Sequence, residues 1–175
     1  MSLDHDFQKD LAWFKKFVHK FNGTSFFVKN SVDAEIHLDA CLTGIGAVFK
    51  NFIYQAQIPD KFQAWHIAAL EIVNIFVALK VWAADWSGKA IEIHCDNEVV
   101  VSVLKFGKTK DANLACISRN IFMIAGHFDI FLKVSHIQGK KNVIAGAQKI
   151  QLQQLLPNNQ WIKIPLEYFE LDYDI

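Results

Sequence analysis

Two short stretches of this chain nearly repeat each other: Glu-Ile-His-Leu-Asp-Ala at residues 35–40 and Glu-Ile-His-Cys-Asp-Asn at residues 92–97. In both, polar and apolar side chains alternate, which is the period-two pattern of a β-strand. Each predicted strand ends near an aspartate, Asp39 or Asp96. If the two strands are parallel neighbours in register, these carboxylates lie about 5 Å apart at the carboxyl edge of a sheet. Open α/β sheets bind their ligands at that edge.

Two carboxylates only about 5 Å apart repel each other, so one of them stays protonated unless a cation lies between them. A hard divalent cation such as Mg²⁺ suits oxygen ligands of this kind. Glu71 is a third candidate ligand, because it lies in the strongly apolar stretch 67–81, where an unpaired carboxylate is costly to bury. Three converging carboxylates would form a metal site suited to phosphoryl transfer. Two structural alternatives stay open: Asp96 as a helix cap, and Glu71 as a first-turn residue that interacts with the helix dipole.

The hydrophobic pattern around these residues predicts one mixed sheet covered by helices. An apolar stripe with helical spacing predicts an N-terminal helix that ends at Asn22-Gly23 and buries the stripe. The stripe consists of Phe7, Leu11, Phe14, Val18 and Phe21. Further strands are predicted over 34–40, 47–49, 52–54, 90–95 and 128–137, and further helices over 65–86, 97–106, 112–125 and 143–155. The aromatic and acidic tail after residue 157 receives no assignment.

Composition excludes several classes of protein. Lys and Arg together number 18, as do Asp and Glu, so no long-range basic field draws the whole chain onto nucleic acid. With Arg119 as its one arginine, the chain cannot depend on arginine to read phosphates or guanines. Three cysteines without CxxC spacing argue against a disulfide framework or a zinc ribbon. Charged residues near the start argue against a secretory signal, and residues 67–86 are interpreted as a core helix, so we expect a cytoplasmic or nuclear protein.

The run Asp-Ala-Cys-Leu-Thr-Gly-Ile-Gly-Ala at residues 39–47 resembles the opening D-A-S-x-x-G-x-G-A motif of ribonuclease H (RNase H) domains in retroelement reverse transcriptases. Leu70-Glu71 resembles the catalytic glutamate of that family, and Cys95-Asp96-Asn97 its second aspartate motif. Residues 136–139 with 142–145 are similar to its terminal H-x-x-G…N-x-x-A-D-A-L-S-R motif. Residues 10–14 and 21–23 resemble the segment that joins polymerase and RNase H modules in gypsy-like and DIRS-like elements. The resemblance spans roughly residues 8 to 155, with motif order and spacing that fit together.

The resemblance implies an RNase H-like α/β fold: a mixed five-stranded sheet with helices on both faces, preceded by an N-terminal helix. It divides the chain into a helical connection segment over 1–27, an RNase H-like domain over 28–156 and a tail over 157–175. The implied reaction is Mg²⁺-dependent endonucleolytic hydrolysis of RNA in RNA–DNA hybrids, with Mn²⁺ as a substitute metal. The implied partners are the hybrid and the polymerase domain of the same polyprotein, and no membrane.

The resemblance also implies roles for single residues. The metal ligands are Asp39, Glu71 and Asp96, and His136 matches the family's active-site histidine, which transfers a proton or assists product release. The implied substrate-binding residues are Ala40, Thr43, Asn97, Lys108 and Lys140, with Asn97 bonding a 2′-hydroxyl and loop lysines contacting phosphates. The alternatives are a surface histidine and lysines that only confer solubility. His37 and His94 are interpreted as structural rather than metal-binding residues.

One departure from the family pattern bears on activity. The last aspartate of the family falls at Gly146, and the next acidic residue along the chain is Glu167. Three of four catalytic acids are therefore present, and we expect impaired cleavage. The main alternative is a catalytically inactive RNase H-fold module that binds nucleic acid or a partner protein. A weaker alternative is another metal nuclease of the same superfold, such as a resolvase or integrase, against which the spacing of the three acids favours RNase H.

Overall fold

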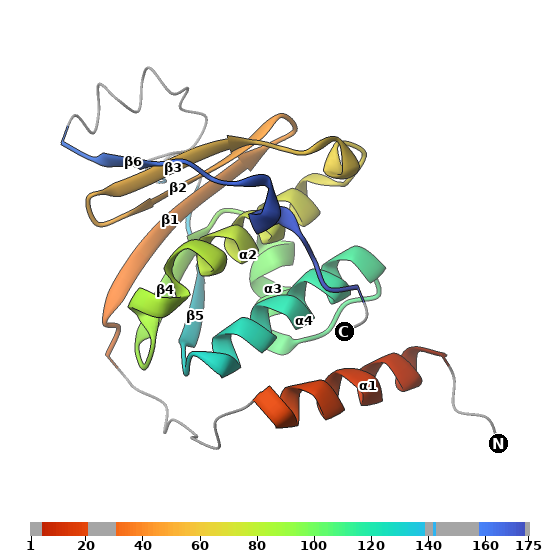
Figure 1. Ribbon diagram of the computed structural model, residues 1–175. Coiled ribbons are helices and arrows are strands. Elements are labelled where there is room, and N and C mark those ends of the chain that lie inside the picture. Colours follow the sequence, from red (N-terminus) through yellow and green to blue (C-terminus); the bar gives the residue numbers. More distant parts are fainter. Residues whose placement is uncertain (1–4, 21–30, 139–141, 143–157, 174–175) are drawn as a thin grey trace.

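The computed structural model describes residues 5–20, 31–138, 142 and 158–173 of the chain. A six-stranded sheet forms one layer and helices pack against it (Figure 1). The strands are β1 (Ala34–Cys41), β2 (Gly44–Phe49), β3 (Phe52–Gln57), β4 (Ala90–Cys95), β5 (Phe131–His136) and β6 (Gln160–Ile162). The helices are α1 (His5–Lys20), α2 (Ile67–Trp86), α3 (Glu98–Phe106) and α4 (Ala112–His127), with the short 3₁₀ turns η1 (Asp60–Phe62) and η3 (Leu166–Phe169).

The strand order in the sheet is β5-β4-β1-β2-β3-β6. Strands β1 to β3 form antiparallel hairpins, whereas β1, β4 and β5 run parallel to one another. Ile36 pairs with Ile93 and His37 with His94, so the prediction that the two near-repeats are parallel neighbours is confirmed. The predicted mixed sheet covered by helices is likewise confirmed. The sheet has six strands instead of five because residues 160–162 of the unassigned tail pair with β3.

Helix α2 forms the centre of the core. It lies against β1 and β2 on one side and α4 on the other, which explains why its sequence is apolar nearly all round. By length and composition α2 is able to cross a membrane, yet 72% of its most apolar window is buried inside the fold. The prediction of a core helix is therefore confirmed. Helices α2, α3 and α4 share one hydrophobic core with the inward-facing residues of β1, β4 and β5.

The boundary between α4 and β5 differs from the predicted one. Gly126 was expected to end the helix, but α4 continues to His127 and β5 begins only at Phe131. The turn comes at Asp129, whose φ is +55°, and Ile130 then bonds back to the carbonyl of Ala125. The predicted last helix over 143–155 lies outside the described residues.

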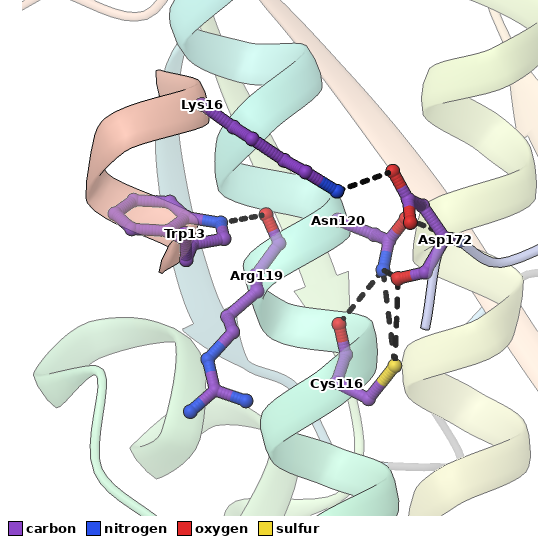
Figure 2. Close-up of polar contacts among 6 residues, drawn as sticks. All are labelled: Trp13, Lys16, Cys116, Arg119, Asn120 and Asp172. Atoms are coloured by element: carbon purple, nitrogen blue, oxygen red, sulfur yellow. Dashed lines mark hydrogen bonds and ion pairs between the residues drawn. The ribbon is translucent and has the colours of Figure 1, made fainter. Parts of the chain in front are cut away.

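Helix α1 packs on α4, but through a different face from the predicted one. The indole of Trp13 donates a hydrogen bond of 3.3 Å to the carbonyl of Arg119, and Lys16 lies 3.8 Å from the Asp172 carboxylate (Figure 2). The ring of Phe17 lies over Gly126. Four residues of the apolar stripe are exposed, so the stripe is not buried against the rest of this chain, and its pairing with a second copy stays a prediction; Phe21 lies outside the described residues. The exposed fractions are 49% for Phe7, 43% for Leu11, 57% for Phe14 and 66% for Val18.

Candidate active site

Three candidate residues lie at the carboxyl edge of the parallel strands. Asp39 is near the end of β1, Asp96 follows β4, and His136 is the last residue of β5. Because β1, β4 and β5 are parallel neighbours, their carboxyl ends meet at one edge of the sheet. Glu71 reaches this edge from α2. The tertiary fold therefore brings together all three acids that the sequence analysis singled out.

The acids are not equally close to one another. Ligand atoms of Glu71, Cys95 and Asp96 all lie within 4.8 Å of one another. Asp39 is not part of this tight group, but it lines the same narrow crevice as Glu71 and its charge acts on the Glu71 carboxyl group.

Glu71 is the electrostatic centre of the crevice. It begins the second turn of α2, since the helix starts at Ile67, so its interpretation as a first-turn dipole residue is wrong. Only 9% of its surface is exposed. The pKa of its carboxyl group is raised to about 7, mainly because burial disfavours the charged form and also because Asp96 and Asp39 carry like charges. Without a cation, Glu71 is thus half-protonated near neutral pH.

Two hydrogen bonds hold the Glu71 carboxyl group in place. The Cys95 thiol donates to Oε2 at 3.2 Å, and the Asn97 amide donates to Oε1 at 3.5 Å. Burial raises the pKa of the Cys95 thiol, so the sulfur keeps its proton and remains a donor. Sequence analysis missed Cys95 as a site residue. Its signal was the difference between the two near-repeats, which place leucine at 38 and cysteine at 95.

Asn97, rather than Asp96, caps α3. Its side-chain oxygen accepts from the backbone N–H groups of Val99 and Val100 at 3.0 and 3.4 Å. The alternative in which Asp96 serves only as a helix cap is therefore wrong, and its carboxylate instead lies within 4.8 Å of the ligand atoms of Glu71 and Cys95. Both ends of the Asn97 amide are engaged, one with α3 and one with Glu71, so this side chain orients the site.

Asn74 fixes α2 to the sheet one turn after Glu71. It is fully buried, and its amide donates to the carbonyls of Asp39 and Gly46 at 2.7 and 2.8 Å. Its oxygen accepts a bond of 2.7 Å from the hydroxyl of Tyr54. Sequence analysis noted Asn74 only as a polar break in an apolar helix. Its three bonds set the distance between Glu71 and the strand that carries Asp39.

The other candidates surround the crevice less tightly. His136 is exposed and pairs in register with Cys95. Ala40 is half-buried in β1, Thr43 is exposed in the turn after it, and Lys108 is exposed in the loop after α3. Lys140 and Gly146 lie outside the described residues. Asn142, from the terminal motif, is buried and donates to the carbonyl of Leu38 at 2.6 Å, which ties the segment after β5 to β1.

No protein-family model matches the chain, and no curated protein matches it by sequence. One solved structure is similar in fold: RNase H1 from the halophilic archaeon Halobacterium salinarum NRC-1. The two structures superpose with a TM-score of 0.48 and 19% sequence identity. The match covers 64% of this chain and 89% of that chain.

The residues of the crevice fit a hard divalent cation. Oxygen ligands from three carboxylates meet the preference of Mg²⁺ and Mn²⁺. Burial and the like charges of Asp96 and Asp39 raise the pKa of Glu71 and so disfavour its charged form. A bound cation would supply compensating positive charge and would displace the proton.

Proposed function

We propose that this chain is an RNase H-type domain of a retroelement reverse transcriptase, with RNA in RNA–DNA hybrids as its substrate. One observation carries the proposal: the buried Glu71 carboxyl group lies near both Asp96 and Asp39 at the carboxyl edge of parallel strands, and its pKa is raised to about 7. A fold that only needed stability would gain nothing from three carboxylates gathered there, because their mutual repulsion costs free energy. The motif order of the sequence identifies the reaction class.

Asp39, Glu71 and Asp96 would hold the metal, which when bound activates water and stabilises the negative charge that develops on the phosphodiester. Cys95 and Asn97 keep the Glu71 carboxyl group oriented through their hydrogen bonds. His136 is exposed at the end of β5 and is free to approach a phosphate and exchange a proton.

Substrate contacts would come from the loops around the crevice. Thr43 and Lys108 are both exposed, the first beyond β1 and the second beyond α3. A lysine there can contact a phosphate, and Thr43 can contact the sugar of the strand in the shallow minor groove. Because Asn97 is already engaged by α3 and Glu71, we assign it a positioning role in place of the expected direct bond to a 2′-hydroxyl.

Gly146 supports a second candidate function. Where the family carries an acid, glycine supplies no ligand, so a chain that has kept the fold but binds hybrids without cleaving them fits the sequence equally well. The two candidates agree on the substrate and differ only in turnover.

A cleavage and binding assay tests both. The full chain is incubated with labelled RNA–DNA hybrid, RNA duplex or DNA duplex, in Mg²⁺ or Mn²⁺, while fluorescence anisotropy measures binding. We expect selective hybrid binding with slow, metal-dependent RNA cleavage that Asp39→Asn and Asp96→Asn abolish and the exposed control Asp85→Asn preserves. Hybrid binding without cleavage in either metal would favour the binding module. Equal affinity for all three duplexes would contradict both candidates.

A further inference from the structure

A second cluster of potential metal ligands lies outside the carboxylate crevice. It consists of Glu35 and His37 on β1 and His94 on β4, whose ligand atoms all lie within 4.8 Å of one another. His37 and His94 are register partners, and their rings stack with centroids 4.7 Å apart. By the alternation of β1, these side chains project from the opposite face of the sheet to Ile36 and Leu38, which face α2 and the core. The cluster is therefore separate from the core.

The spacing of two of the three ligand atoms already matches a tetrahedral metal site. His94 Nε2 lies 3.2 Å from Glu35 Oε2. Two ligands bound to one zinc ion at about 2.0–2.1 Å and a tetrahedral angle lie about 3.3 Å apart. A metal ion can therefore replace the shared proton with almost no movement of either side chain. His37 is the third ligand: at most about 1.5 Å has to close between its ligand atom and the other two, and the two stacked rings have to turn toward one ion.

His37 provides an independent sign of an incomplete site. Its Nδ1 atom is buried and has no hydrogen-bond partner within the described part of the chain. Buried polar atoms nearly always have a partner, and an isolated one costs free energy. The stack with His94 does not satisfy this nitrogen, because ring stacking leaves the in-plane lone pairs unused.

The neighbouring acid is already committed elsewhere. Glu92, the register partner of Glu35, accepts hydrogen bonds from Ser135 and Lys133 of β5. The charge of Glu92 is therefore paired within the sheet. Glu35 instead makes its hydrogen bond with His94. This contrast makes Glu92 a matched control, with the same residue type in the same row of the same face.

We propose that Glu35, His37 and His94 form a binding site for one first-row transition metal ion, with Zn²⁺ as the reference ion. Imidazole nitrogen with one carboxylate suits Zn²⁺ and Co²⁺, whereas Mg²⁺ prefers ligand sets made only of oxygen. The bound ion would link β1 to β4 two residues before Asp39 and Asp96, and so brace the strands that carry the two aspartates. The site does not depend on the nuclease proposal.

The test is metal titration of the untagged full chain after removal of metals with a chelator. We expect one Zn²⁺ per chain, a visible absorption band of tetrahedral Co²⁺, a rise in melting temperature with Zn²⁺, and no competition from millimolar Mg²⁺. His37→Gln and His94→Gln should each weaken Zn²⁺ binding at least tenfold, and Glu35→Gln should weaken it less. Glu92→Gln and the exposed His127→Gln should leave the affinity unchanged.

Two results would overturn the proposal. One is unaltered Zn²⁺ affinity in the His37→Gln/His94→Gln double variant. The other is loss of Zn²⁺ binding with Cys95→Ala, which would place the ion among Glu71, Cys95 and Asp96. Should the histidine variants fold poorly, side-chain NMR of the wild-type chain decides instead. Zn²⁺ must then shift the signals of two of the seven histidines, and shifts in none or in other histidines would contradict the site.

Discussion

The thiol of Cys95 lies 3.2 Å from Oε2 of Glu71 and donates a hydrogen bond to a carboxyl group that is only 9% exposed. This contact joins β4 to α2 at the point where the two elements enclose the crevice. It holds the Glu71 carboxyl group close to Asp96 in the absence of a cation. The side chain is thus pre-organised, and the protein bears the electrostatic cost of that arrangement in the metal-free state.

The free-energy cost of burying the Glu71 carboxylate near two aspartates predicts a specific pH dependence of stability. Folding raises the pKa of Glu71 from 4.5 to about 7, so the folded state holds a proton that the unfolded state has lost. The metal-free protein should therefore become less stable as the pH rises from about 4.5 to 7, by about 1 to 2 kcal/mol after allowance for solvent screening. Glu71→Gln should remove this loss and make the protein more stable than wild type at pH 8. Urea denaturation at pH 5 and pH 8, with a chelator present, measures the free energy of unfolding of both proteins.

The exposed Glu167→Gln is the matched control for this experiment and should behave as wild type does. If the free energy of unfolding changes equally with pH in wild type and Glu71→Gln, burial of the Glu71 carboxyl group does not destabilise the protein at high pH. Addition of Mg²⁺ should reverse the order of stability at pH 8, since wild type has all three proposed carboxylate ligands whereas Glu71→Gln keeps only two and binds the ion more weakly.

Asn74 should prove essential for the packing of α2 on the sheet. Asn74→Ala leaves the carbonyls of Asp39 and Gly46 and the hydroxyl of Tyr54 without this partner, for an expected loss of about 2–4 kcal/mol. Tyr54→Phe removes one of these bonds and should cost about 1 kcal/mol. The exposed Asn113→Ala should cost little. Chemical denaturation measures all three, and a loss from Asn74→Ala no larger than from Asn113→Ala would refute the role.

Gly126 should control the docking of α1 on α4. An added Cβ would lie 2.5 Å from the ring of Phe17, so Gly126→Ala must displace that ring. Alanine also favours the helix over glycine by roughly 0.5–1 kcal/mol, so α4 itself should not suffer. We expect faster proteolysis and hydrogen exchange within residues 5–20, with the remaining fold as stable as before.

Trp13→Ala should have the same effect on α1, because it removes the bond to Arg119, whereas Leu11→Ala on the exposed stripe should not. Deletion of residues 1–23 should lower the melting temperature or the solubility. Unchanged protection of α1 in Gly126→Ala would show that Phe17 does not hold the helix in place.

The last prediction concerns Gly146. If the missing acid limits catalysis, Gly146→Asp should raise Mg²⁺-dependent hybrid cleavage by well over tenfold, which corresponds to more than about 1.4 kcal/mol of barrier. Mn²⁺ should rescue the unmodified chain only in part. Gly146→Asn is the control, because asparagine has the shape of aspartate but lacks its charge. Full Mg²⁺-dependent cleavage by the unmodified chain would disprove the assignment of impaired activity to this position.

Local features of the sequence were sufficient to locate most strands and helices. Strand β4 coincides with its predicted range because period-two alternation runs from Ile91 to Cys95. Helix α3 begins after Asn97 because a short polar side chain there can cap the free N–H groups. The three acids were recognised because each interrupts a pattern or ends a strand. The domain boundaries and the roles of the site residues stay predictions.

Long-range packing decided what local pattern could not. Strand β6 has only three residues, and its pairing with β3 rather than its own periodicity makes it a strand. The stripe of α1 predicted burial, yet Trp13 and Phe17 dock the helix because α4 offers the Arg119 carbonyl and the bare surface of Gly126. Asp39, Glu71 and Asp96 are separated by up to 57 positions in the chain, and they meet only because β1 pairs in parallel with β4 and α2 packs on the sheet. The sequence determined which groups are available, and the register of the sheet decided which of them meet.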